Sequence, residues 1–234
     1  MKYIKKGVEP ESLTHHRCKS HADYDNYDKK DDLRNALLME QGHICCYCMQ
    51  RIKIRKMKIE HWKPQADFKS LQLNYKNLLG ACLGGKGQPL HLQHCDTGKG
   101  KELITINPTD KNCETFIKFS SSGKIYSDNE NVDRDIDKTL NLNMQTIKKN
   151  REAALDEALE LLRKEHPGRW TKDILNREIR RWSSRQRAYK PYCQIVVLYL
   201  KKKIGKMRLS EKRERLPLPL GYMRIARQFT IHNS

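Results

Sequence analysis

Four cysteines in the first half of the chain constrain its fold most, because their spacing is typical of metal ligands. Cys45 and Cys48 are separated by two residues, as in a zinc knuckle, where a tight turn directs two thiolates at one ion. Cys82 and Cys95 follow and complete the four soft ligands of a tetrahedral structural site. We therefore expect a structural zinc (Zn²⁺) that ties together separate segments of the chain.

Two substitutions within this ligand set remain open from the sequence. Cys46 is adjacent to Cys45 and has the same chemistry, and a histidine at 91 or 94 could replace Cys82. The remaining cysteines are isolated and are expected to be spectators: Cys18, Cys113 and Cys193. In a reducing compartment, clustered cysteines indicate metal binding rather than disulfides.

The charge of the chain favours a polyanionic partner. The net charge is +19, and residues 163–234 carry 20 Lys or Arg against five Asp or Glu. Such a basic field attracts nucleic acid, although a solvated basic surface or contact with acidic lipids has the same signature. The longest apolar run, Ile195 to Leu200, is too short to span a bilayer, and no apolar stretch follows the basic start. We expect a cytoplasmic protein with no membrane contact.

The pattern of residues predicts an α+β fold in three regions. Residues 1–44 form a polar lead-in with one short helix, residues 45–130 a Cys-, His- and Gly-rich core with short strands, and residues 131–234 a basic helical region for partner or nucleic-acid contact. The helices are expected at Asp31–Gln41, Ile147–Glu165, Thr171–Arg187 and Pro191–Lys203. The strands are expected as hairpins over Ile52–His61 and Phe116–Tyr126 and as one strand over Leu103–Ile106.

Three segments interleaved with the cysteines carry the chemistry. They are Lys58-Ile59-Glu60-His61-Trp62-Lys63-Pro64, Asn77-Leu78-Leu79-Gly80-Ala81-Cys82 and His94-Cys95-Asp96-Thr97-Gly98-Lys99. In this order the chain resembles zinc-braced HNH nucleases, and more closely the PtuB-like nucleases of Septu and some retron anti-phage systems. Their hallmarks look like Cys-x-Tyr-Cys, Ile-Glu-His-x-x-Pro, Asn-Leu-Leu-Gly and His-Cys-Asp-x-x-Lys-Gly.

The resemblance implies a ββα-metal (HNH) core and an endonuclease that hydrolyses phosphodiester bonds. His61 would be the general base, and Glu60 and Asp96 would hold a catalytic Mg²⁺ or Mn²⁺, since carboxylates suit hard cations. Asn77 would tie the loop down and orient His61 through a backbone hydrogen bond, with no direct chemical role. Lys99, with Lys101, would hold the substrate phosphate.

Each role has a structural alternative. The histidine could be an ordinary hydrogen-bonded side chain, Asn77 and Asp96 could be caps, and the lysines could be solvated charges. Tyr47 and Trp62 are expected to be core aromatics. The sequence also departs from the general HNH pattern. Two residues usually separate the last cysteine pair, whereas Cys82 and Cys95 are 13 positions apart in this chain.

The resemblance also implies partners. PtuB-like nucleases act as toxic effectors of antiviral defence beside a PtuA-like ABC ATPase, and in retron versions beside a reverse transcriptase and its single-stranded DNA. Two other functions remain open: a non-catalytic zinc-knuckle nucleic-acid-binding protein, and an ATPase-regulating subunit with a degenerate site. The joint presence of Glu60, His61, Asn77 and Asp96 disfavours the first, and the intact Glu60-His61 pair disfavours the second.

Overall fold

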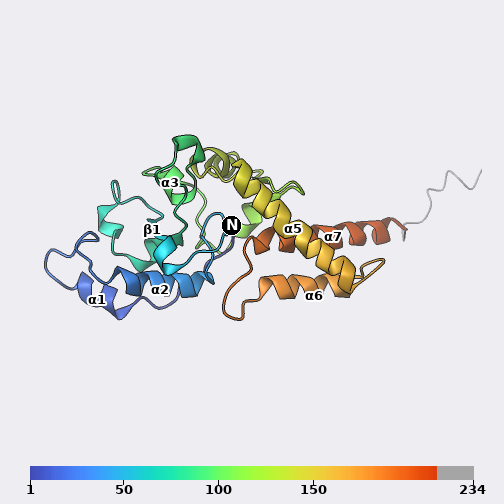
Figure 1. Cartoon of the computed structure of the whole chain (residues 1–234), viewed down its shortest axis with the longest axis horizontal. Helices are drawn as coiled ribbons and strands as arrows, with labels where there is room; N and C mark the ends of the chain where they lie inside the picture. The colour runs from blue at the N-terminus through green and yellow to red at the C-terminus, as the bar shows by residue number, and fades with distance from the viewer. Residues whose placement is uncertain (215–234) are drawn as a thin grey trace, which may run out of the picture.

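The computed structural model describes residues 1–214, in which helices predominate and two small sheets are formed (Figure 1). The helices are α1 (Glu11–Arg17), α2 (Lys30–Gln41), α3 (Cys95–Lys99), α4 (Glu130–Arg134), α5 (Gln145–Glu165), α6 (Lys172–Ser183) and α7 (Cys193–Glu214). A π-helical turn, Asp135–Thr139, continues α4. Short 3₁₀ turns lie at Ile54–Lys56, Lys69–Leu71, Tyr75–Asn77, Leu90–Leu92 and Cys113–Phe116.

The first sheet pairs two four-residue strands that are distant in sequence. β1 (Lys58–His61) runs antiparallel to β2 (Leu78–Ala81), with Glu60 opposite Leu79 and His61 opposite Leu78. The hairpin expected over Ile52–His61 is therefore wrong. Its first half forms a 3₁₀ turn, and the partner of β1 comes from the Asn-Leu-Leu-Gly segment instead.

The second sheet confirms the hairpin expected over Phe116–Tyr126. β3 (Lys118–Phe119) pairs with β4 (Ile125–Tyr126), and Gly123 turns between them with a φ of 73°. The strand expected over Leu103–Ile106 is wrong, because the segment has no partner strand. Its backbone is satisfied differently, since the amide of Thr105 donates to the carboxylate of Asp135.

The helices largely follow the apolar periodicity. α2 ends at Gly42, whose φ of 60° is the left-handed conformation that glycine adopts most easily. The hydroxyl of Thr171 caps α6 by accepting from the amide of Ile174 at 3.3 Å. Two predicted boundaries are wrong: α6 stops four residues before Arg187, and α7 continues through Gly205 to Glu214. A single exposed glycine weakens a helix without ending it.

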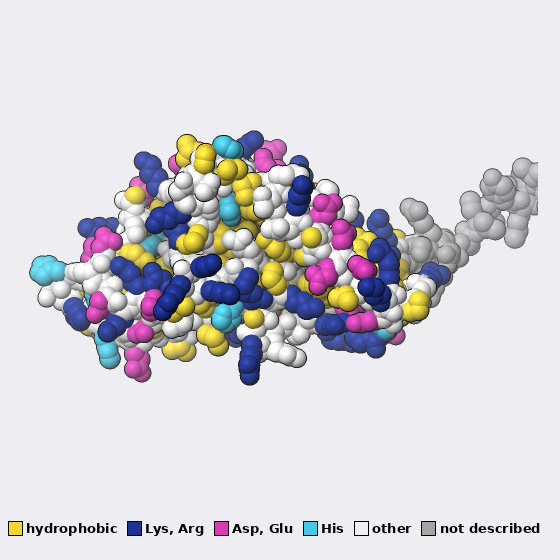
Figure 2. Space-filling model, viewed as in Figure 1, with side chains coloured by type: hydrophobic (Ala, Val, Ile, Leu, Met, Phe, Trp, Pro, Cys, Tyr) yellow, Lys and Arg dark blue, Asp and Glu magenta, His cyan; other side chains and the backbone are white. Residues whose placement is uncertain are grey.

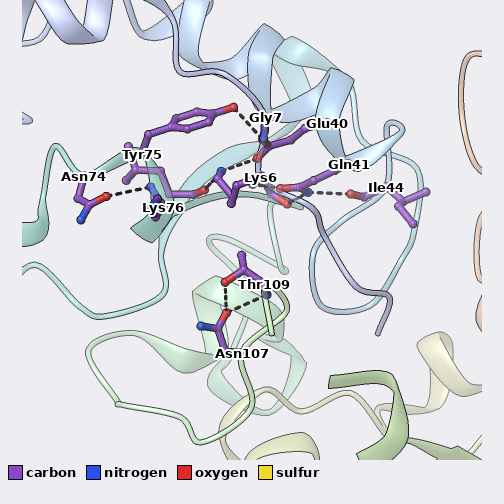
Figure 3. A network of polar contacts seen from close by, with 12 residues as sticks. Lys6, Gly7, Glu40, Gln41, Ile44, Asn74, Tyr75, Lys76, Asn107 and Thr109 are labelled. Carbon is purple, nitrogen blue, oxygen red and sulfur yellow. Dashed lines mark hydrogen bonds and ion pairs between the residues drawn. The ribbon is translucent and has the colours of Figure 1, made fainter. Parts of the chain in front are cut away.

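Contacts from residues 1–44 tie this segment to the first sheet (Figure 3). Lys6 is paired with Glu40 and donates to the carbonyl of Leu78 at 2.8 Å. The buried amide of Gln41 brackets Gly80 of β2: it accepts from the Gly80 amide at 2.6 Å and donates to the Gly80 carbonyl at 2.8 Å and to the Ile44 carbonyl at 3.0 Å. The segment before residue 45 thus supports the strand that leads to Cys82.

Helices α5, α6 and α7 pack together on the other side of the molecule from α1, α2 and β1 (Figure 1). The fully buried guanidinium of Arg151 on α5 donates to the carbonyls of Gly123 and Leu142, which fastens the second sheet to the helices. Among the described residues, no helix combines the length and apolar character that a membrane span requires. The region boundaries at 44 and 130 stay predictions.

Replacing Gln41 with methionine tests the bracket. Gln41→Met keeps the side-chain volume but leaves the buried amide and carbonyl of Gly80 without this partner, so we expect a loss of about 2–4 kcal/mol in the free energy of unfolding. Denaturant unfolding measures it, with Gln145→Met at an exposed position of α5 as the matched control. An equal loss in both variants would contradict the role of the bracket.

Candidate metal centre and active site

Four buried thiols converge at the end of the first sheet. The Sγ atoms of Cys45, Cys48, Cys82 and Cys95 all lie within 4.8 Å of one another. Cys45 and Cys95 are 3.8 Å apart and Cys48 and Cys82 are 3.9 Å apart. In a tetrahedral zinc site with bonds of about 2.3 Å, neighbouring sulfurs are about 3.8 Å apart. The cluster therefore fits a single tetrahedral ion such as zinc, and its members are the four cysteines predicted from the sequence.

A tight turn presents the first two thiols. An isolated bridge joins Ile44 to Arg51, the amide of Cys45 donates to the carbonyl of Gln50 at 2.9 Å, and Met49 turns the chain with a φ of 66°. The Cys45 sulfur also accepts from the amide of Cys82 at 3.3 Å. This geometry favours Cys45 over Cys46 as the ligand, since Cys46 does not belong to the cluster.

A closed loop explains the long spacing between the other two thiols. The amide of His94 donates to the carbonyl of Gly84 at 2.9 Å, so the chain returns to its starting point before Cys95. Gly84 has a φ of 58°, and a Cβ there would collide with the carbonyl oxygen of His94. His94 remains a neighbour of the cluster, with Nε2 3.7 Å from the sulfur of Cys82.

The same elements bring two carboxylates together beside the cluster. Glu60 comes from β1 and Asp96 from the first turn of α3, directly after Cys95. The Glu60 carboxylate is almost fully buried, accepts from the Tyr47 hydroxyl at 2.7 Å and pairs with Lys99 at 2.8 Å. Asp96 is paired with Lys58, whose ammonium also donates to Thr97 at 3.2 Å.

Burial and mutual contact move the pKa values of the two carboxyl groups apart. Burial, reinforced by the hydrogen bond and charge of Asp96, raises the pKa of Glu60 well above its usual range. Burial acts in the same direction on Asp96, but hydrogen bonds from Glu60 and Lys58 outweigh it and lower the pKa of Asp96. Burial thus disfavours a negative charge on Glu60, whereas the neighbours of Asp96 favour one there. A divalent cation beside the two groups would favour the ionised form of both, and oxygen ligands suit Mg²⁺ or Mn²⁺.

His61 follows Glu60 at the end of β1 and has a defined orientation. Its Nε2 lies 2.9 Å from the carbonyl oxygen of Gln72, and the ring of Tyr24 meets it edge-on at a centroid distance of 4.5 Å. A carbonyl oxygen can only accept a hydrogen bond, so Nε2 carries the proton and Nδ1 of the neutral ring has the free lone pair. Burial lowers the pKa of His61, which favours this neutral form near pH 7.

Asn77 closes the loop that follows His61. Its carboxamide accepts from the amide of Lys63 at 2.8 Å and donates to the carbonyls of Lys63 at 3.0 Å and Leu71 at 3.3 Å. The Asn77 carbonyl accepts from the amide of Trp62 at 3.0 Å. The side chain therefore ties down the loop that begins two residues beyond His61, through backbone hydrogen bonds. Its role in orienting His61 stays a prediction.

The position of Lys99 differs from the expectation of a phosphate-binding lysine. Its side chain is 1% exposed, and its ammonium is shared between Glu60 and the carbonyl of His61, 3.0 Å away. In this arrangement it fastens α3 to β1 and has no open side for a substrate phosphate. Lys101 is exposed, and the half-buried Lys58 lies beside Asp96.

Sequence reasoning missed two partners in this network. Lys58 was overlooked as an ordinary strand residue, although its place two residues before Glu60 on an antiparallel strand puts both on one face. Tyr47 was expected only as a core aromatic, and it is fully buried, but its hydroxyl also binds Glu60. Its position between two ligand cysteines was the available signal.

Comparison with known proteins gives one distant relative. No family model matches the chain. A protein of Vibrio cholerae serotype O1 biovar El Tor, named "Retron Vc95 putative HNH endonuclease", is 26% identical over 99 residues, or 41% of this chain and 47% of the relative. The chain thus spans about half the length of this relative. The similarity supports the HNH part of the resemblance; the relative's name mentions a retron and contains nothing of Septu, PtuB-like proteins or an ATPase.

Removing one thiol tests the metal centre. Cys48→Ser should lower the metal content of the purified protein and unfold the region around the first sheet, because binding of a structural ion is coupled to folding. Elemental analysis and circular dichroism measure both effects. Cys18→Ser, at an exposed thiol outside the cluster, is the matched control. A wild-type protein that is fully folded without bound metal would contradict the assignment.

Proposed function

We propose that this protein is a metal-dependent endonuclease of the HNH type, with a structural zinc in the four-cysteine cluster. The observation that carries the proposal is the placement of three side chains at one sheet end: Glu60 and Asp96, near enough to shift each other's pKa, and His61, next to Glu60 on β1, with Nδ1 available as a base. The name of the Vibrio relative supports the same activity. Strands β1 and β2 followed by α3 also have the chain order of a ββα-metal core.

The residues divide the work of phosphodiester hydrolysis. Nδ1 of His61 accepts the proton of the attacking water, while the bond from Nε2 to Gln72 holds the ring and stabilises the imidazolium that forms. The contact with Tyr24 keeps the ring from rotating. Asn77 fixes the loop after His61, so that the base returns to the same position in each turnover.

Glu60 and Asp96 are the residues that would hold the catalytic cation. Mg²⁺ or Mn²⁺, when bound, would neutralise the charge that builds on the phosphoryl and leaving oxygens. Lys58 is half-buried beside Asp96 and would face the substrate phosphate, a role that the buried Lys99 does not fill. Lys99 would keep its place and hold Glu60 in position.

We further propose that the nuclease acts in a retron-type or PtuB-like antiviral defence system, beside an ABC-type ATPase. The retron in the relative's name and the motif resemblance support this setting. A non-catalytic zinc-knuckle nucleic-acid-binding or ATPase-regulating protein is the rival function. A protein with that rival function would not need two carboxylates and an oriented histidine in one site. Incubation of the purified protein with plasmid and with total RNA, with and without Mg²⁺ or Mn²⁺, separates the two functions.

Replacing His61 tests the base. We expect His61→Ala to slow cleavage by about 10²–10⁴-fold, the usual contribution of a positioned general base. Because His61 is buried and bonded to Gln72, the metal content and thermal unfolding of the variant protein must be measured together with its cleavage rate. His15→Ala, at an exposed histidine of α1, is the matched control and should cleave like the wild type. Wild-type cleavage by a folded His61→Ala protein would show that the base is another residue.

Replacing Asp96 tests the cation site separately. Asp96→Asn removes a ligand charge but preserves the shape of the side chain, so the concentration of Mg²⁺ that gives half-maximal cleavage should rise at least tenfold. Excess Mn²⁺ should restore part of the rate. The control is Asp67→Asn, at an exposed carboxylate. If both variants require the same Mg²⁺ concentration as the wild type, Asp96 is not a cation ligand.

A further inference from the structure

A second candidate site lies among the helices at the other side of the molecule from β1 and α3 (Figure 1). A cavity of about 800 Å³, open to solvent, is lined by the β3–β4 hairpin, α5 and α7. A second cavity of about 760 Å³ lies between the end of α5, the turn before α6 and α7. Lys203 and Lys206 line both cavities, so the two are adjacent along α7, and we call them together the α7 groove.

The charge of this groove has one sign. It is lined by Lys118, Arg163, Arg169, Lys202, Lys203 and Lys206, and none of its lining residues is acidic. Lys118 is paired with Asp128, but Lys202 and Lys206 have no acidic partner among the described residues. They are exposed and one helical turn apart on α7, so both ammonium groups face the same side. On the face in Figure 2, Lys and Arg side chains also lie over α6 and α7.

Aromatic side chains alternate with these cations. Phe119, Tyr126 and Tyr199 line the first cavity and Trp170 the second, and all four are partly exposed. Lys203 lies over the ring of Trp170, 4.9 Å from its centroid. The buried Arg151 lies 5.9 Å from the centroid of Phe119, on the side of the protein interior. Flat apolar surfaces thus lie within reach of several positive charges.

We propose that this groove binds a nucleic-acid strand with unpaired bases. The lysines would neutralise successive phosphates, and the aromatic rings would stack on bases. A duplex keeps its bases inside and offers only phosphates, so it has no use for the aromatic walls, whereas an unpaired base fits a cavity of this volume. This binding site goes beyond the proposed function, because it is separate from the residues that would cleave.

The test measures binding in the absence of divalent cations, so that no cleavage can occur. Fluorescence anisotropy reports the affinity of the full chain for labelled oligothymidylate and oligouridylate strands longer than the roughly 4–16 nucleotides that one binding fold covers. We expect Lys202→Gln/Lys206→Gln to lose about tenfold in affinity and to reduce the slope of log K against log salt by about 1.4, or about 0.7 for each phosphate contact. Tyr199→Leu should weaken binding about fivefold or more with an unchanged salt slope.

The matched control removes the same charge from the same helix. Lys201 and Arg208 are exposed on α7 but line neither cavity, so Lys201→Gln/Arg208→Gln should change the affinity less than twofold. Equal losses in the two double variants would overturn the groove and leave only a diffuse basic surface. Tighter binding of a duplex, or displacement of the strand by polyglutamate at equal charge concentration, would also overturn it; the latter would point to an acidic protein partner.

The outcomes also separate this site from the proposed nuclease. A protein that binds strands through Lys202 and Lys206 but never cuts them, with any divalent cation, would refute the nuclease and keep the groove. A protein that cuts, but whose two double variants bind strands equally well, would keep the nuclease and refute the groove.

Discussion

The four-thiol cluster is the constraint on which the rest of the active region depends. The first sheet has only two strands of four residues, and an isolated pair of that size is marginally stable in water. A structural zinc bound by four cysteines contributes about 10–16 kcal/mol in small domains, far more than such a sheet supplies. The cluster joins the turn at Cys45–Cys48, the residue after β2 and the first residue of α3. That connection, together with the contacts of Lys99 and Lys58, fixes α3, and Asp96 with it, against Glu60.

This arrangement places ionisable groups where their charges are costly unless they are paired. Glu60 and Lys99 are each about 1% exposed, and an unpaired charge at that depth costs several kcal/mol. The ion pair and the Tyr47 hydroxyl offset that cost, so they keep a carboxylate inside the protein beside the cluster. Lys99 also donates to the carbonyl of His61 and so couples the position of Glu60 to that of His61. Replacing Lys99 would therefore disturb the positions of both residues.

The sequence could predict the thiol cluster because Cys45 and Cys48 lie in one turn, where their type and spacing are typical of metal ligands. Glu60 and His61 are adjacent on one strand, as expected, while their roles stay predictions. The partner of β1 could not be predicted in this way. The register of Glu60 opposite Leu79 depends on Gln41, a polar residue of a surface-like helix that reaches across to Gly80. The burial of Lys99 could not be predicted from its neighbours in the sequence either. Its ammonium group is buried only because α3 packs against β1, where it pairs with Glu60.

The two parts of the molecule would use positive charge in different ways. At the metal centre the cations act over about 3 Å within a buried network, where salt has little access and geometry determines the strength of each pair. Along α7 the lysines are exposed, so their attraction for a polyanion extends over about 10 Å and falls steeply with salt. Capture of a strand by the helices and hydrolysis at the sheet would therefore respond differently to ionic strength. Raising the salt should weaken capture long before it affects the chemistry of a strand that is already bound.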